Sequence, residues 1–242
     1  MRIESYTVLH YGLDYLPYAI KSVIDQVDRF HVVYTPHPSH GSRTDVPPPE
    51  TRAQLHAAAM AVGPKVVWHD VDAFWQEGPH RDYALSLCQG DLALVVDADE
   101  VWDGAMLERV LRFAYDGAHR DTLVACKTLW RSFNWLCEDP MQPVRVIKKA
   151  GTGTAAFAPD GGWFWHFGYA VRDEICRYKW RCHGHLAEFR QGWFEEKWEP
   201  WPPVDDVHPT CADHMWDPKL FDKERLPEVL RGHPFWDLEM IP

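Results

Sequence analysis

The order of apolar and amphipathic segments in the first half of the chain restricts the fold more than any other feature. Apolar runs typical of strands occupy residues 4–9, 30–34, 65–68, 92–96, 123–129 and 144–147. Amphipathic segments with helical spacing occupy residues 16–27, 51–62, 80–88 and 104–115. Strands that alternate with helices need crossover connections, which produce a mainly parallel sheet covered by helices. We therefore expect an α/β fold with a Rossmann-like central sheet.

The alternation stops near residue 150, and the rest of the chain has a different composition. Residues 151–162 are rich in Gly, Ala and Thr, which predicts a loop. Eight of the 13 Trp residues stand at or after Trp163, and the chain has 14 His. We expect helices at residues 171–181 and 219–231. The sequence thus indicates one domain that ends in a Trp- and His-rich segment.

Charge and composition exclude some classes of partner. The chain has 242 residues, a net charge of −11 and no long basic run, which argues against binding nucleic acid through bulk electrostatics. It has neither an apolar run of the ~20 residues that span a bilayer nor the apolar core of a signal peptide. We expect a cytoplasmic protein with no stable membrane insertion. Its six Cys form no C-x-x-C pair and are expected to be reduced.

The segment DLALVVDADEVW, residues 91–102, carries the clearest chemical signal. The apolar run 92–96 has the composition of a buried strand, and Asp97 and Asp99 follow it directly. Side chains two apart on a strand point the same way, so the two carboxylates would repel each other unless a cation lies between them. Mg²⁺ and Mn²⁺ prefer such oxygen ligands, and in parallel sheets ligands bind beyond the carboxyl ends of the strands. The plainer alternative is a strand that ends in an acidic, solvated turn.

A zinc site is a competing interpretation of the later histidines. Residues 182–185 (CHGH) and 211–214 (CADH) each contain a Cys-x-x-His spacing. Cys182, His185, Cys211 and His214 would be enough to close a tetrahedral zinc site. This interpretation competes with a catalytic role for His185.

The motifs around the acidic segment resemble the family 2 type of GT-A nucleotide-sugar glycosyltransferases. The resemblance rests on HRDYAL at residues 80–85, on Gly90-Asp91 and on the strand that ends in DADE at residues 97–100, and it covers residues 3–130. Asp82 stands where that family usually has Asn. The resemblance implies a GT-A fold, with a nucleotide-sugar-binding half at residues 1–130 and an acceptor-binding half at residues 131–242.

That resemblance also implies a cofactor and a set of donor-binding residues. A nucleotide-diphosphate sugar, in the first place a UDP-sugar, would bind with Mn²⁺ or Mg²⁺. The donor would contact Val8, Arg81, Asp97 and Asp99, and the metal would be held by Asp97 and Asp99 together with a later histidine.

A second resemblance concerns residues 162–169 (GWFWHFGY), Glu174-Ile175, Lys179 and His185. These residues look like the C-terminal part of β-1,4-N-acetylglucosaminyltransferase-like proteins. His166 and His185 are the first candidates for the third metal ligand, and His183 is the next. The alternative for each is an ordinary surface or core histidine.

The acceptor side needs a general base and a surface for a sugar ring. Asp173 and Glu174 open a predicted helix and fit the position of the base, although acidic residues also favour a first helical turn for electrostatic reasons. Trp163, Trp165 and Tyr169 are candidates for stacking on an acceptor, and the alternative is core packing.

The sequence thus predicts a metal-dependent hexosyl- or pentosyltransferase that acts on a saccharide hydroxyl, with inversion implied by the resemblance alone. One alternative is a phage-type DNA glycosyltransferase that modifies a hydroxylated nucleobase, for example a hydroxymethyl base. Another is a carbohydrate-binding protein without catalytic activity. A nucleotidyltransferase is disfavoured, because residues 10–13 (HYGL) do not form its Gly-rich basic loop.

Overall fold

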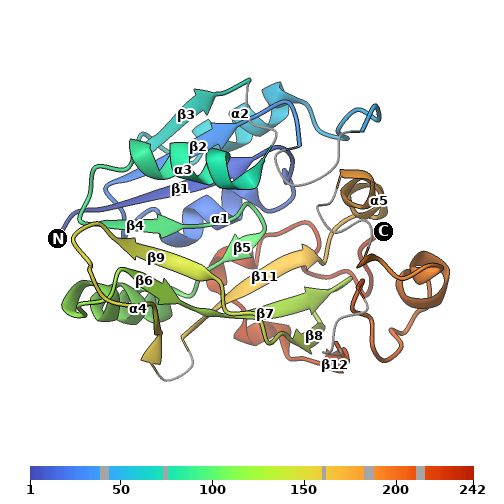
Figure 1. The fold of residues 1–242 in the computed structure, drawn as a ribbon. Coiled ribbons are helices and arrows are strands. Elements are labelled where there is room, and N and C mark those ends of the chain that lie inside the picture. Colours follow the sequence, from blue (N-terminus) through green and yellow to red (C-terminus); the bar gives the residue numbers. More distant parts are fainter. Residues whose placement is uncertain (39–43, 73–75, 160–161, 183–187, 211–215) are drawn as a thin grey trace.

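The computed structural model describes residues 1–38, 44–72, 76–159, 162–182, 188–210 and 216–242, and it contains two β-sheets that share one body (Figure 1). The seven-stranded sheet has the order β10-β6-β9-β4-β1-β2-β3, and the five-stranded sheet has the order β12-β8-β7-β11-β5. In the larger sheet β3, β2, β1 and β4 are parallel, whereas β9 runs antiparallel to β4 and β6. The predicted α/β fold with a mainly parallel central sheet is confirmed.

The strands of the larger sheet are β1 (Ile3–Leu9), β2 (Arg29–Tyr34), β3 (Val66–Asp70), β4 (Leu92–Val95), β6 (Asp121–Leu123), β9 (Val144–Lys148) and β10 (Ala156–Phe157). The strands of the smaller sheet are β5 (Glu100–Val101), β7 (Ala125–Trp130), β8 (Trp135–Glu138), β11 (Trp163–Tyr169) and β12 (Lys219–Leu220). The predicted strand at residues 123–129 is therefore wrong as a single element. It is divided between β6 and β7, which belong to different sheets.

Both faces of the larger sheet are covered. The helices are α1 (Leu16–Val23), α2 (Arg52–Met60), α3 (Glu77–Leu87), α4 (Gly104–Asp116) and α5 (Asp173–Cys182). Leu92 and Leu94 of β4 pack in the cluster that includes residues of α1, α2 and α4, whereas Ala93 and Val95 pack in the cluster that includes Ala84 of α3. Such alternation explains the continuous apolar run, because a strand buried on both faces has no polar side.

Local signals in the sequence explain where the first helices begin. Thr51 caps α2 through a reciprocal pair of hydrogen bonds with Gln54, and the Asp103 side chain accepts from Met106 N at the start of α4. The buried face of α4 consists of its apolar residues at helical spacing, which are Met106, Leu107, Val110, Leu111 and Ala114. No helix in the described part of the chain is long and apolar enough to cross a bilayer.

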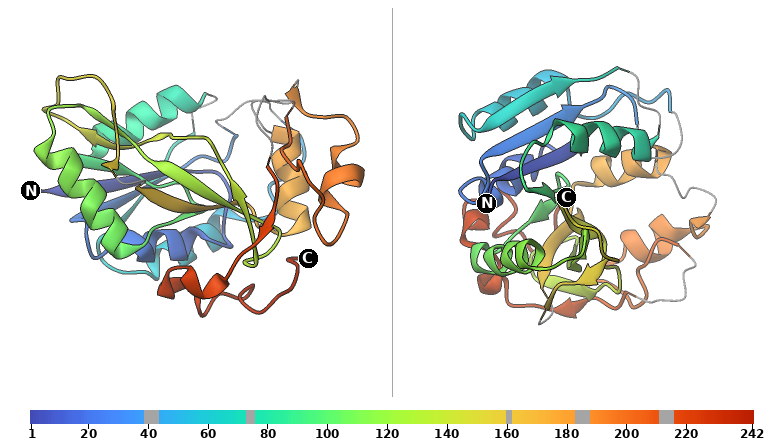
Figure 2. Two further views of the ribbon diagram at one scale, coloured as in Figure 1. Left: turned by 90° about the horizontal axis from the view of Figure 1, so that it is seen from below. Right: turned by 60° about the vertical axis from the view of Figure 1, so that its left-hand side comes forward.

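The C-terminal third forms a second core around the smaller sheet. Trp130, Trp193 and Trp198 are buried there and contact one another edge-on or stacked. The last segment, red in Figure 2, runs back to the start of α5, where Asp173 N donates to the carbonyl of Pro242 at 2.8 Å. Most of the tryptophan content therefore serves packing.

The predicted helix at residues 219–231 is wrong. The structure has β12 at its start and two short 3₁₀ segments, Lys223–Arg225 and Glu228–Leu230, in its place. Pro227 separates the two segments, and a proline has no N–H to continue a helix through that position.

Candidate active site

The acidic segment forms the link between the two sheets. β4 ends at Val95 in the larger sheet, and β5 begins at Glu100 in the smaller one. β5 pairs antiparallel with β11, in a register that places Glu100 opposite His166, and Phe167 N donates to the carbonyl of Asp99 at 2.8 Å. This pairing brings the DADE motif of the first half against the Trp/His-rich strand of the second half.

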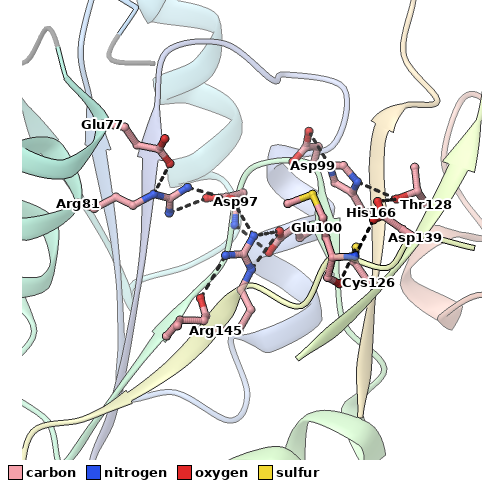
Figure 3. Close-up of polar contacts among 12 residues, drawn as sticks. Glu77, Arg81, Asp97, Asp99, Glu100, Cys126, Thr128, Asp139, Arg145 and His166 are labelled. Carbon is pink, nitrogen blue, oxygen red and sulfur yellow. Dashed lines mark hydrogen bonds and ion pairs between the residues drawn. The ribbon is translucent and has the colours of Figure 1, made fainter. Parts of the chain in front are cut away.

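Asp97 and Asp99 do not face the same way, because both lie in the turn after β4 and do not continue the strand. Figure 3 shows Asp97 among arginines and Asp99 beside His166. The premise of two carboxylates side by side on one strand face is thus wrong. Instead, Asp97 and Asp99 belong to two different clusters of side chains that lie next to each other.

The first cluster surrounds Asp97 with two guanidinium groups. Arg81 Nη1 lies 3.1 Å from Asp97 Oδ1, and Arg145 Nη2 lies 2.9 Å from Asp97 Oδ2. Arg145 also pairs with the buried carboxylate of Glu100, and Arg81 Nε donates to Glu77 at 2.6 Å. Because both oxygens of Asp97 face arginines, Asp97 fixes the position of Arg81 in the cavity wall described below.

Burial and these ion pairs act on the carboxyl pKa values in opposite directions. Burial disfavours the charged form of Asp97, but Arg81 and Arg145 outweigh it and hold the pKa of Asp97 well below its usual range. Burial raises the pKa of Glu100, Arg145 opposes that effect, and the nearby charge of Asp97 adds to it. Of the two carboxyl groups, Asp97 is therefore the one that is firmly ionised.

The second cluster consists of Asp99, His166, Thr128 and Asp139. His166 Nε2 lies 3.7 Å from Asp99 Oδ2, and His166 Nδ1 lies 3.1 Å from the Thr128 hydroxyl, which donates to Asp139 Oδ2 at 2.9 Å. A hydroxyl has one proton, so Thr128 gives it to Asp139 and accepts from His166 Nδ1–H. Nε2, the ring nitrogen that lies beside Asp99 in Figure 3, is then the one without a proton.

The charge state of His166 agrees with this arrangement. Burial lowers the pKa of His166, although the Asp99 carboxylate acts in the opposite direction. A neutral imidazole with a bare Nε2 beside a carboxylate oxygen is a donor set that suits a divalent cation.

Gly168 leaves room beside these two ligand-type atoms. A Cβ at position 168 would lie 2.5 Å from His166 Nε2 and 3.2 Å from Asp99 Oδ2. The space between the imidazole and the carboxylate therefore depends on the absence of a side chain at this position.

Two cavities meet at this site. One of about 280 Å³ is lined by Val8, His10, Gly12 and Asp99, among others. The other, of about 790 Å³, is lined by Asp139, Tyr169 and Glu188, among others. Both are lined by Glu77, Arg81, Asp97, His166 and Lys179. Two adjoining spaces with a shared polar wall can hold two reactants side by side.

The structure brings together several of the residues predicted from the sequence. Val8, Arg81, Asp97, Asp99 and His166 all line the smaller cavity. Tyr169 is buried and lines the larger one.

Trp163 and Trp165 are not among the residues that line either of these two cavities. Trp165 is buried against Phe221, and Trp163 has Lys127 Nζ 3.8 Å from its ring centroid. Trp165 thus packs in the second core and Trp163 makes a cation–π contact, and the prediction that both bind an acceptor stays a prediction.

Asp173 and Glu174 begin α5 but are likewise not among the lining residues of these cavities. Asp173 accepts from Arg177 at 2.6 Å and from Trp198 Nε1 at 2.8 Å. Glu174 pairs with Arg172, whose Nε also lies 3.0 Å from Asp14, a residue of the smaller cavity. Their prediction as general bases stays a prediction.

His183, His185, Cys211 and His214 lie outside the described residues, so the prediction of His185 as a ligand and of a zinc site stays untested. Cys182 is described, and it is buried and lines the smaller cavity.

Sequence reasoning missed four residues that shape the site, which are Arg145, Thr128, Asp139 and Glu50. The Glu50 carboxylate accepts from Gly12 N at 2.6 Å and from Leu13 N at 2.9 Å, and it fixes the loop after β1. Arg145 offered a signal, because an arginine in the middle of an apolar strand must have a buried partner. Thr128 and Asp139 offered none, because the role of Thr128 depends on the pairing of β7 with β11, and that of Asp139, which follows β8, on the pairing of β7 with β8.

No protein-family model matches the chain, and no curated protein matches it. Among solved structures, it is similar to glucosyl-3-phosphoglycerate synthase from Mycobacterium tuberculosis in complex with Mg²⁺ and uridine diphosphate. That match has 16% identity and a TM-score of 0.37, and it covers 54% of this chain and 44% of that one. The chain is also similar to S. aureus TarS 1–349 in complex with UDP, with 12% identity, a TM-score of 0.47 and coverage of 69% and 60%. The chain thus matches less than two thirds of the length of either protein.

Proposed function

We propose that this protein is a metal-dependent glycosyltransferase that moves a hexose or pentose from a nucleotide-diphosphate sugar, in the first place a UDP-sugar, to a hydroxyl of a saccharide acceptor. The observation that carries the proposal is the pair of Asp99 Oδ2 and His166 Nε2, 3.7 Å apart in the wall of the smaller cavity, where His166 also lines the larger one. The DADE motif, and its resemblance to GT-A transferases, supply the reaction class.

The residues present fit a divalent cation. Asp99 offers a carboxylate oxygen, His166 a bare imidazole nitrogen, and Gly168 the space between them. We assign Asp99 and His166 as ligands of Mn²⁺ or Mg²⁺. Asp97, which was also predicted as a metal ligand, has both oxygens beside arginines, and its proposed role is to orient Arg81 toward the donor. When bound, the cation neutralises the diphosphate that leaves the sugar.

Lys179 adds positive charge at the same wall. Its Nζ donates to the carbonyl of Gly168 at 3.2 Å, and an ammonium has three donors. We propose that Arg81 and Lys179 contact the diphosphate from both sides of His166. Preorganised cations at the place where negative charge develops are an effective means of stabilising a transition state.

The general base stays with Asp173 or Glu174 in this proposal, in an inverting reaction. If Asp173 is the base, Asp173→Asn should lower kcat at least about 100-fold without changing donor binding, and if Glu174 is the base, Glu174→Gln should do so. If neither does, the base is to be sought among the carboxylates of the cavities, beginning with Asp14 and Asp139.

Nucleotide-sugar turnover with Mn²⁺ tests the proposed function. UDP-, GDP- and ADP-sugars are supplied with a panel of saccharide acceptors, and release of the nucleoside diphosphate is measured for the wild type and for Asp99→Ala. We expect turnover with one nucleotide that Asp99→Ala abolishes. Turnover unchanged in Asp99→Ala would refute the mechanism, and saccharide binding without turnover of any donor would favour the carbohydrate-binding alternative.

The DNA-modifying alternative is less well supported. The net charge of −11 opposes the approach of a polyanion such as DNA. Modified DNA belongs in the acceptor panel, and transfer to it that falls steeply with salt would favour this alternative.

A further inference from the structure

Three side chains of metal-ligand type meet away from the cavities, near the amino-terminal end of the parallel strands. Glu4 lies near the start of β1, His31 in β2, and Cys88 directly after α3. A carboxylate oxygen of Glu4, a ring nitrogen of His31 and the sulfur of Cys88 all lie within 4.8 Å of one another. All three residues are at most 3% exposed, so ionisable and nucleophilic groups are gathered here in the protein interior.

His31 has a hydrogen bond at one ring nitrogen, whereas its other ring nitrogen faces Glu4. Its Nδ1 lies 3.0 Å from His69 Nε2, whereas its buried Nε2 has no hydrogen-bond partner among the residues that the structure describes. The nearest charged atom to that nitrogen is Glu4 Oε2, at 3.5 Å. A buried polar atom without a partner costs free energy, and a bound cation would remove that cost. His69 would then act as the outer partner that fixes the tautomer of a ligating histidine.

Glu4 is held in place from the other side. Its Oε2 accepts from Gln89 N at 2.6 Å, and its Oε1 pairs with Arg2, whose side chain is half exposed. These contacts orient the carboxylate toward His31 and Cys88. Arg2 thus connects the Glu4 carboxylate to the surface of the molecule.

We propose that Glu4, His31 and Cys88 form a zinc site. Zinc accepts carboxylate oxygen, imidazole nitrogen and thiolate sulfur at about 2.0–2.3 Å, and a thiolate disfavours Mg²⁺ and Ca²⁺. The ligand atoms reach those distances if they draw together by roughly 1 Å. Cys88 binds as the thiolate, its proton passes to solvent, and a water completes four-fold coordination.

The position of the site suggests a structural role. Cys88 ends α3, the helix that carries Arg81 and Glu77, and the two other ligands lie on the strands β1 and β2 beneath that helix. A zinc ion there ties the end of α3 to the sheet. This role differs from that of the Asp99–His166 pair, and the inference does not depend on the proposed transferase activity.

Cobalt substitution tests the proposal. Protein freed of metal by chelation is titrated with Co²⁺, and the near-ultraviolet charge-transfer band between thiolate and cobalt is recorded. We expect a band that saturates at one equivalent and is displaced by Zn²⁺. It should be lost in Cys88→Ser and bind at least tenfold more weakly in His31→Gln. Far-UV circular dichroism confirms that each variant is folded.

Three control variants should keep the band. Cys137→Ser removes a thiol buried elsewhere, Cys182→Ser removes the thiol in the smaller cavity, and Asp99→Asn removes the proposed catalytic ligand. If the wild type shows no thiolate band, or if Cys88→Ser keeps it undiminished, the proposal is wrong, whatever the outcome for transferase activity. A band lost in Asp99→Asn would also contradict a separate zinc site.

Discussion

Asp99 Oδ2 and His166 Nε2 lie 3.7 Å apart, although one residue follows a strand of the larger sheet and the other belongs to a strand of the smaller sheet. The pairing of β5 with β11 produces this approach, and the hydrogen bond from Phe167 N to the Asp99 carbonyl fixes it. The candidate metal site thus lies at the junction of the two sheets. Substitutions that separate these two side chains should lower metal binding and activity more than they lower the stability of the fold.

Gly168→Ala tests the space between the two ligands. The new Cβ would stand 2.5 Å from His166 Nε2, so the imidazole, held at its other nitrogen by Thr128, must move. We expect Mn²⁺ affinity, measured by calorimetry, to fall at least about tenfold, with a loss of about 1–3 kcal/mol in stability from overpacking. Gly232→Ala is the control, because a Cβ there meets no atom within 4 Å. Equal Mn²⁺ affinity in both variants would contradict the assigned site.

Thr128→Val tests the chain of hydrogen bonds from Asp139 to His166. Valine has nearly the same shape as threonine but cannot accept from His166 Nδ1 or donate to Asp139. Loss of an outer partner of a metal ligand lowers affinity or activity about 10- to 100-fold, and we expect kcat/KM at subsaturating Mn²⁺ to fall by that factor.

The matched control for this test is Thr7→Val. The Thr7 hydroxyl is buried and has no hydrogen-bond partner in the described part of the chain, so its removal should leave activity unchanged. An equal loss in both variants would show that the effect of Thr128→Val comes from packing and not from the histidine.

Arg145→Met tests the buried ion pairs around Asp97. Arg145 is 8% exposed and is shared by Asp97 and Glu100, so its removal leaves the buried Glu100 carboxylate close to the partly buried Asp97 carboxylate without the cation between them. We expect a loss of about 3–5 kcal/mol in the free energy of unfolding, measured with urea. Arg112→Met, which breaks an exposed pair with Glu108, should cost less than about 0.5 kcal/mol. Similar small losses in both would show that the network contributes little.

His80 makes stability depend on pH. Burial lowers its pKa from 6.5 to about 4, and its Nε2 lies 3.0 Å from the carbonyl of Val33. Because the folded pKa is depressed, the unfolded chain binds the proton first as the pH falls. The contribution of neutral His80 to the stability of the fold is therefore complete above pH 6.5, and it is lost progressively as the pH falls through the pKa of His80 in the folded protein.

The variant His80→Gln isolates this contribution, since glutamine can still donate to the Val33 carbonyl. Between pH 6.5 and 4 we expect the wild type to lose about 3 kcal/mol more than the variant, because one pKa unit corresponds to about 1.4 kcal/mol. Parallel curves of stability against pH for the two proteins would contradict the depressed pKa.

The sequence predicted five strands of the larger sheet, β1, β2, β3, β4 and β9, because their features are local, whereas it merged β6 with β7 and placed β10 in a loop. The continuous apolar run of β4, the apolar face of α4 and the capping of α2 by Thr51 need only neighbouring residues. The smaller sheet was missed because β5 and β12 have two residues each and depend on partners far along the chain. The same difference between local and long-range features applies to the candidate site. DADE indicated Asp99, whereas the relation of His166 to Thr128 and Asp139 needed the pairing of β7 with both β11 and β8.

The most direct test of the central claim is calorimetric titration of UDP into the protein with and without Mn²⁺, for the wild type and for Asp99→Asn. The account predicts that Mn²⁺ tightens UDP binding by at least about 1.4 kcal/mol, a factor of ten, in the wild type, and that Asp99→Asn removes this gain. It predicts the same loss for His166→Gln. UDP binding that does not respond to Mn²⁺, or a full response in Asp99→Asn, would contradict the assignment of Asp99 and His166 as the metal site.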